Sequence, residues 1–179
     1  SSDDDVYMRF LVYDDVGATG FGTPGRWVET ATIAESNTLN VQTMPYYLSW
    51  DSTLSSYVIQ AYPWTRRDAG DDSTNKFPSF VGQKIRDIAE FQSRLVIAAG
   101  ASIVMSETDR PENFFRKSVS QKVSSDRIDI RSSRNSAPIE WMVPFDRDLI
   151  LLTEDTQLMV YGTTGITPDN ASIVVTTSF

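Results

Sequence analysis

The sequence contains no cysteine and no histidine. Without cysteine the chain can form no disulfide, no thiolate nucleophile and no zinc site built on sulfur. Without histidine it has no Ser-His-Asp triad, no imidazole-bound metal and no general base of the usual kind near neutral pH. Any enzyme built from these residues would therefore have to work with carboxylates, lysine or tyrosine.

Long apolar runs and an excess of basic residues are also missing. No stretch approaches the roughly 18 consecutive apolar residues that a membrane-spanning helix needs, so we expect no such segment. Sixteen Lys and Arg stand against 24 Asp and Glu, for a formal net charge of −8. Since this charge opposes contact with phosphate, a surface that grips nucleic acid is not expected.

The residues that are present favour a folded β protein. The chain has 179 residues, 40% hydrophobic and 22% charged, which suffices for one domain or two small ones. Residues 6–13 are rich in β-branched and aromatic side chains, and a glycine-rich tip separates them from a second strand at residues 26–30, which predicts a hairpin. Residues 46–50 and 57–61 predict a second hairpin with a short polar turn.

The best internal boundary lies where the composition becomes polar and acidic, at residues 68–75. We therefore expect an N-terminal β-hairpin region over residues 1–69 and a second region over residues 70–179. Just beyond the boundary, residues 83–92 fit either a short helix or a strand, because the apolar residues there satisfy both spacings.

A repeat occupies the second region. Three positions match at one spacing of 54 residues: Phe91 with Phe145, Leu95 with Leu149, and Met105 with Met159. Each copy runs as strand, two-residue polar turn, apolar strand, turn and strand. Repeats of such meanders every roughly 40 to 50 residues are typical of propeller blades. We therefore predict an all-β fold of antiparallel strand meanders, β-propeller-like blades, with at most short helices.

The repeat has two further interpretations. Residues 46–61 fit a third, weaker copy of the same pattern. Two hairpins rich in Leu and Met would also align by chance, in which case the repeat would carry no architectural meaning.

Neighbouring carboxylates are the residues to examine for catalysis, since a glycosidase needs two of them about 5 to 9.5 Å apart. The pairs are Asp14 with Asp15, Asp71 with Asp72, Glu107 with Asp109, Asp126 with Asp129, and Glu154 with Asp155. Because acids are abundant in this chain, we expect turn residues. Neither Asp3-Asp4-Asp5 nor Asp71-Asp72 has the spacing of a Ca²⁺ loop, so we assign no catalytic residue, metal ligand or cofactor.

Two adjacent aromatics, Phe114 and Phe115, lie in a polar loop that contains Pro111. Such a loop is either attached to a core or presents a patch to a partner. The sequence leaves both interpretations open.

Short signatures follow one another along nearly the whole chain. They are Trp27-Val28-Glu29-Thr30, Thr43-Met44-Pro45, Trp64 with Arg66 or Arg67, Gly70-Asp71-Asp72 to Asn75, Pro78-Ser79-Phe80-Val81-Gly82, Arg94-Leu95, Met105-Ser106, Asn113-Phe114-Phe115, Ile128-Asp129, Val143-Pro144-Phe145, Leu149-Ile150-Leu151, Gln157 and Ile166-Thr167-Pro168. In this order they resemble the tail nozzle (tail tubular protein B) family of short-tailed, podovirus-type bacteriophages. Lys76-Phe77 and Ile166 depart from the family pattern.

The resemblance implies a non-enzymatic structural protein of the virion, located in the tail. Six copies would close a β-rich tube that serves as the conduit for DNA ejection. Its partners would be further copies of itself, the tail adaptor (tubular protein A) and the tail fibre proteins, while genomic DNA would pass without specific binding. Family members are several times longer, so we expect these residues to be an internal portion.

The resemblance also gives the loops a role. Residues 70–82 become an architectural connection in which Asp71 and Asp72 are loop acids or helix N-caps, and Phe114 and Phe115 help to form contacts between subunits. We accordingly expect Asp71→Ala to change stability little, and Leu149→Ala to cost about 2 to 5 kcal/mol.

A second hypothesis belongs to another class of function. A carbohydrate-binding or carbohydrate-cleaving β module at a phage tail tip would stack sugar rings on exposed Trp27, Trp50 or Trp64. Binding to glycans would favour this hypothesis, whereas a ring formed by the full-length protein would favour the nozzle.

Overall fold

The computed structural model describes residues 6–12, 25–132, 137–162 and 165–178. These residues form β-strands and no helix. The strands are β1 (Tyr7–Val12), β2 (Gly25–Thr30), β3 (Tyr46–Asp51), β4 (Ser56–Ala61), β5 (Ile85–Phe91), β6 (Arg94–Ala99), β7 (Ser102–Met105), β8 (Ile128–Arg131), β9 (Trp141–Phe145), β10 (Asp148–Leu152), β11 (Thr156–Val160) and β12 (Val174–Ser178). The all-β prediction is confirmed, and the helix alternative for residues 83–92 is wrong.

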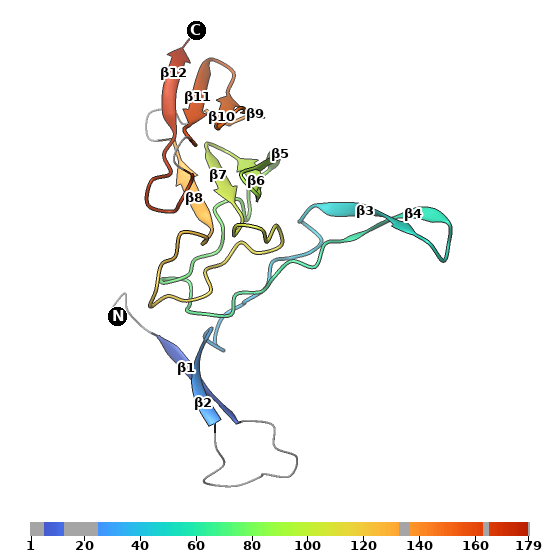
Figure 1. The fold of residues 1–179 in the computed structure, drawn as a ribbon, viewed down its shortest axis with the longest axis vertical. Coiled ribbons are helices and arrows are strands. Elements are labelled where there is room, and N and C mark those ends of the chain that lie inside the picture. The colour runs from blue at the N-terminus through green and yellow to red at the C-terminus, as the bar shows by residue number, and fades with distance from the viewer. Residues whose placement is uncertain (1–5, 13–24, 133–136, 163–164, 179) are drawn as a thin grey trace.

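The strands belong to four antiparallel sheets. Two are ribbons, β1-β2 and β3-β4, and two are four-stranded meanders, β5-β6-β7-β8 and β9-β10-β11-β12. In Figure 1 the two meanders lie next to each other in the body, while each ribbon projects from it in its own direction. Both predicted hairpins are therefore present, although the glycine-rich tip of the first falls outside the described residues.

The 54-residue repeat corresponds to the two four-stranded meanders. In the first, Gln92 and Ser93 form the turn between β5 and β6 with φ of 49° and 57°, as expected for a tight hairpin turn whose twist matches its strands. The side-chain amide of Gln92 donates to the carbonyls of Gly162 (2.9 Å) and Arg147 (3.3 Å), so it contacts the equivalent turn of the second meander. Residues 46–61 are a separate two-stranded ribbon, so the interpretation as a third copy is wrong.

The first meander is buried on both faces. Its central strands read as almost continuous apolar runs because β6 and β7 are covered from both sides. One face packs against the second meander and forms the inter-meander core: Phe91, Val96, Ala98, Ile103, Met105 and Ile128 with Ile139, Met142, Leu149, Leu151, Leu158, Val160 and Ile166. The other face packs under the loops and forms the loop-side core: Ile97, Ala99 and Val104 with Leu39, Met44, Phe80, Phe114 and Phe115.

Backbone hydrogen bonds cross the expected boundary at residue 70. The Thr32 N–H donates to the carbonyl of Gly70 (2.9 Å), and the Gly70 N–H donates to that of Thr30 (3.3 Å). Gly70 has φ of 72°, a conformation that glycine adopts without the strain an L side chain would suffer. The division into residues 1–69 and 70–179 stays a prediction.

Candidate functional site

Asp71 organises the turn that opens the loop at residues 70–82. One of its carboxylate oxygens accepts from the N–H groups of Ser73 and Thr74 (both 2.9 Å) and from their hydroxyls (2.7 and 2.9 Å). The other accepts from the hydroxyl of Tyr7 at 3.1 Å. The Ser73 hydroxyl, followed by the backbone N–H of Thr74, holds the pKa of Asp71 well below its usual value. These contacts argue against the expectation that Asp71→Ala changes stability little, which stays a prediction to be measured.

Asp72 faces a buried arginine. The guanidinium of Arg67 donates to carboxylate oxygens of Asp72 (2.5 Å) and Glu35 (3.1 Å), and to the side-chain oxygen of Asn37 (3.0 Å). It also lies over the ring of Phe77, 5.1 Å from the centroid. A fully buried cation needs such partners to offset its lost hydration. Asp71 and Asp72 thus hold a loop together, and no helix follows them, so the N-cap interpretation is wrong.

The buried acids of the longer loop have structural partners as well. Glu107 accepts from the side-chain amide of Asn113 (2.8 Å) and forms an ion pair with Lys117 (2.5 Å). Asp126 accepts from the backbone N–H of Val123 at 2.9 Å. Both carboxylates are therefore engaged within the loop.

Among the remaining described acids, Asp129 on β8 and Asp155 in the turn before β11 also have structural partners. Asp129 accepts from the N–H and the hydroxyl of Ser79 (2.8 and 2.6 Å), and Asp155 accepts from the hydroxyls of Thr153 and Thr156 (3.1 and 2.9 Å). Asp3-Asp4-Asp5, Asp14 and Asp15 lie outside the described residues. In the described ranges no three acidic side chains gather in a way that could hold a metal ion.

Phe114 and Phe115 are buried in the loop-side core. Phe114 meets the ring of Phe80 edge to face at 5.2 Å, and Phe115 meets that of Phe77 at 5.4 Å. The structure thus selects the interpretation that attaches this loop to a core. The expectation that the two aromatics contact neighbouring subunits is wrong, because their surface is already used.

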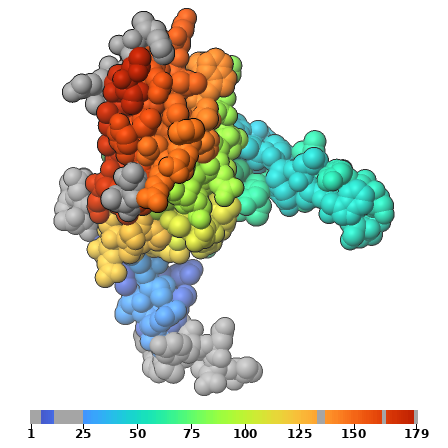
Figure 2. Space-filling model, turned by 45° about the horizontal axis from the view of Figure 1, so that its top comes forward, coloured from blue at the N-terminus to red at the C-terminus, as the bar shows by residue number. Residues whose placement is uncertain are grey.

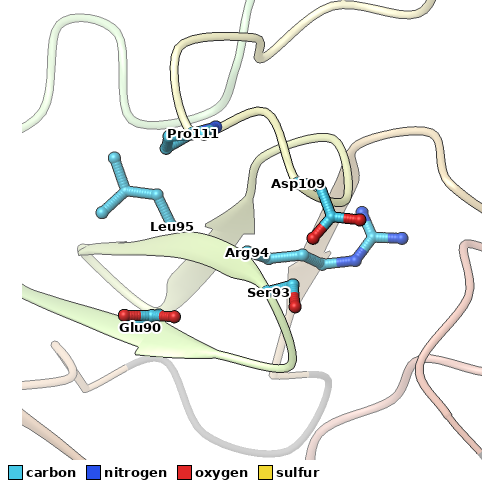
Figure 3. Close-up of a pocket in the computed structure, with 6 residues that line it drawn as sticks. All are labelled: Glu90, Ser93, Arg94, Leu95, Asp109 and Pro111. Atoms are coloured by element: carbon cyan, nitrogen blue, oxygen red, sulfur yellow. The ribbon is translucent and has the colours of Figure 1, made fainter.

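A cleft of about 350 Å³ lies between the turn of β5 and β6 and the loop at Pro111 (Figure 3). Its acids, Glu90 and Asp109, are exposed and lie at opposite ends of the group of labelled side chains. Its arginine, Arg94, is buried and donates to the backbone carbonyls of Ser106 (2.6 Å), Ser124 (2.9 Å) and Asp126 (2.8 Å). Burial lowers the pKa of Arg94. The cleft therefore lacks two opposed, sheltered carboxylates.

The tryptophans considered for sugar stacking belong to separate parts of the molecule. Trp27 is on β2 of the first ribbon and Trp50 is on β3 of the second. Trp64 lies at the base of the second ribbon, between the rings of Tyr62 (4.9 Å) and Phe114 (5.8 Å). The three indoles form no common platform, so nothing in this geometry favours the carbohydrate hypothesis.

The most unusual surface belongs to the second ribbon, β3-β4, which we call the arm. Its strands pair Tyr46 with Ala61, Leu48 with Ile59, and Trp50 with Tyr57. Opposed residues in an antiparallel pair share a face, so one face of the arm is entirely apolar. Its side chains are largely exposed, with Leu48 at 61%, Tyr57 at 68% and Ile59 at 72%.

The opposite face of the arm is more polar, and the arm carries one charged residue, Asp51. There Gln60 donates to the hydroxyl of Ser49 at 2.8 Å. Figure 2 shows the arm extending away from the body, and the other described residues leave its apolar face uncovered. Alternation in the sequence predicted the hairpin, but it gave no sign that this apolar face is uncovered.

The base of the arm is fixed by aromatic contacts. Tyr47 meets Tyr62 edge to face at 5.3 Å, and Tyr62 continues to Trp64 and the loop-side core. Asp51 closes the far turn by accepting from the N–H groups of Thr53 and Leu54 (2.8 and 3.1 Å). The direction of the arm is thus set by packing at its base.

Among the described residues no helix is long and apolar enough to cross a membrane.

Comparison with known proteins gives this architecture its context. The family described as "Bacteriophage nozzle protein" matches residues 1–179. The tail tubular protein gp12 of Escherichia phage T7 is 29% identical over 154 residues, which are 86% of this chain and 19% of that protein. The chain thus spans about a fifth of the length of this relative. It belongs to the bacteriophage nozzle protein family and is a structural component of a phage tail.

Proposed function

We propose that the chain forms part of the wall of a nozzle ring, in which copies of one subunit close a tube that conducts the genome out of the capsid. By resemblance to the family the ring has six copies, no enzymatic activity, and the tail adaptor and fibre proteins as neighbours. The observation that carries the proposal is the arm, because an uncovered apolar ribbon that points away from its own body suits contact with a neighbouring subunit.

The size of the arm fits such a contact. A two-stranded ribbon alone is marginally stable in water, so its apolar face gains from being covered. An aromatic side chain buries about 150–250 Å², and three of those on this face are aromatic: Tyr46, Trp50 and Tyr57. The arm thus offers several hundred Å², comparable with the roughly 800 Å² that each partner buries in a standard interface.

The direction of the arm is compatible with a ring. The arm and the body are different surfaces of one chain, so an arm that packs on the next body makes a head-to-tail contact. Such contacts form a ring when the rotation closes.

The charge of the chain is compatible with a conduit. Each phosphate neutralised by Lys or Arg would add to an affinity that the moving genome must break. A net charge of −8 weakens such attraction over roughly 8 to 10 Å at physiological salt.

Two neighbouring substitutions on β4 test the arm. Ile59→Glu places a carboxylate on the apolar face, and Gln60→Glu places one on the opposite face. We expect Ile59→Glu to raise the protein concentration needed for assembly by about tenfold or more, which corresponds to about 1.4 kcal/mol, and Gln60→Glu to change it by less than about twofold. Light scattering of the full-length protein over a concentration series measures this, with particle images to show the ring.

Two results would contradict the proposal, at different levels. If both variants assemble like the unaltered protein, the arm is not the contact between subunits, but the proposal of a ring is not contradicted. If the unaltered protein forms no ring at any concentration, the conduit itself is wrong. Urea denaturation of both variants serves as the control that the body stays folded.

A further inference from the structure

The two meanders repeat each other face by face as well as strand by strand. The face of the first meander that packs in the inter-meander core includes Ala89, Phe91, Val96, Ala98, Ile103 and Met105. Residues 54 positions later are Val143, Phe145, Ile150, Leu152, Gln157 and Met159. We call these six, together with Trp141 and Val174, the outer face. The second meander packs on one face of the first meander. Its own outer face has apolar residues at the positions equivalent to that covered face.

The strand register confirms that these residues share one face. Ile150 lies opposite Val143 on β9 and opposite Met159 on β11, and Leu152 lies opposite Trp141. Leu149 and Leu151 alternate with them and are fully buried in the inter-meander core. The outer face therefore points away from the first meander.

The outer face is uncovered in the described structure. Phe145 is 66% exposed, Trp141 60% and Val143 44%, while Ile150 and Leu152 are half-buried and belong to neither core. Contiguous apolar patches beyond a few hundred Å² are uncommon on monomers and mark interaction sites. A surface built from this many apolar side chains on one sheet belongs to that class.

The repeat itself points to a cover for this surface. In the first meander the equivalent face is covered by the next meander in the sequence, through side chains such as Leu149, Leu151 and Leu158. The two meanders also keep equivalent strands together, since the Met142 N–H on β9 donates to Asp87 on β5 at 2.6 Å. A third meander placed by the same step would meet the outer face with its own apolar side.

A longer chain of the family has ample sequence to supply such a unit. The matched part makes up only 19% of the curated relative, and a four-stranded meander here needs about one repeat of 54 residues. We propose that the outer face is the docking surface for a third four-stranded meander of the same repeat, which follows this segment in the longer protein. This inference concerns packing within one subunit and does not depend on the proposed ring.

Cysteine reactivity provides the test, because the chain has no cysteine of its own. Ile150→Cys reports on the outer face, and Glu154→Cys, on the exposed turn between β10 and β11, is the matched control. The reaction with a maleimide is measured for each variant in the 179-residue chain and in the full-length protein, at a concentration below that of ring assembly. We expect Ile150→Cys to react at least about tenfold more slowly in the full-length protein, and Glu154→Cys to react alike in both.

A second measurement uses stability. Val143→Asp places a charge on the outer face, so we expect it to lower the urea midpoint of the full-length protein and to leave that of the 179-residue chain nearly unchanged. Equal reactivity of Ile150→Cys in the two proteins would overturn the proposal. So would protection that appears in the 179-residue chain alone and increases with its concentration, because a second copy would then cover the face.

Discussion

The backbone N–H of Met142 donates a 2.6 Å hydrogen bond to a carboxylate oxygen of Asp87. This bond joins the first strand of one meander to the first strand of the other. Beside it Arg86 and Glu140 form an ion pair at 3.0 Å. The contact between the meanders thus has a polar rim next to its apolar core, and the rim fixes which strands lie together.

This polar contact predicts a specific loss. Asp87→Ala leaves the Met142 N–H without its acceptor in a partly buried place, which should lower the free energy of unfolding by about 1–3 kcal/mol. Glu90→Ala removes an exposed carboxylate from the same strand and should change it by less than about 0.5 kcal/mol. Urea denaturation measures both, and equal effects would show that Asp87 adds nothing to the joint.

The inter-meander core predicts a contrast between adjacent residues of β10. Leu149 is fully buried, so Leu149→Ala should cost about 2 to 5 kcal/mol through lost burial and the cavity left behind. Ile150 lies on the outer face, and Ile150→Ala in the 179-residue chain should cost no more than about 1.5 kcal/mol. Denaturant midpoints compare the two variants. A larger loss of stability for Ile150→Ala would show that the core lies on the opposite face of β10.

The buried guanidinium of Arg67 predicts that replacing the arginine costs more stability than replacing its partner Asp72. Arg67→Met removes a donor shared by the carboxylates of Asp72 and Glu35 and by the backbone carbonyls of Ser36 (3.0 Å) and Asn75 (3.2 Å). It should cost about 3 kcal/mol or more because these acceptors lose their partner. The Asp72 side chain is 60% exposed, so Asp72→Asn should cost about 1 kcal/mol or less. Thermal or urea unfolding measures both, and a small effect at Arg67 would contradict its role in the loops.

The acidic turn predicts a dependence on pH. The pKa of Asp71 is lowered by the Ser73 hydroxyl and the Thr74 N–H, so its ionised form stabilises the folded state. That contribution is fully present above the unfolded pKa, near 3.8, and is lost as the pH falls through the lower folded value. The unaltered protein should therefore lose stability below about pH 4 more steeply than Asp71→Asn. Urea midpoints at pH 7, 4 and 2.5 test this, and parallel profiles would contradict it.

The strands and the repeat could be predicted because their signals are local or periodic. The ribbon strands at 46–51 and 56–61 follow from alternating side chains and a polar turn, and the meanders from matched positions 54 residues apart. Residues 83–92 were ambiguous because Ile85, Ile88 and Phe91 have helical spacing. In the strand, Ile88 faces outward and is 42% exposed, so burial alternates and the helical spacing is incidental.

The loops could not be predicted because their contacts join distant residues. Arg67 and Arg94 look like ordinary surface arginines in the sequence, yet both are buried and gather carbonyls from several loops. The same holds for Phe114 and Phe115, whose partners are brought together only by the fold. Whether a face is covered depends on chain segments beyond the strand itself, which explains why the arm and the outer face were not found in advance.

The arm also exposes backbone groups at its edges. Both of its strands are edge strands with open backbone donors and acceptors, and only Asp51 brings a charge to them. Uncharged edges of this kind pair readily with other chains. In the proposed ring, a neighbouring subunit that covers the arm would also shield these edges from irregular pairing with other chains.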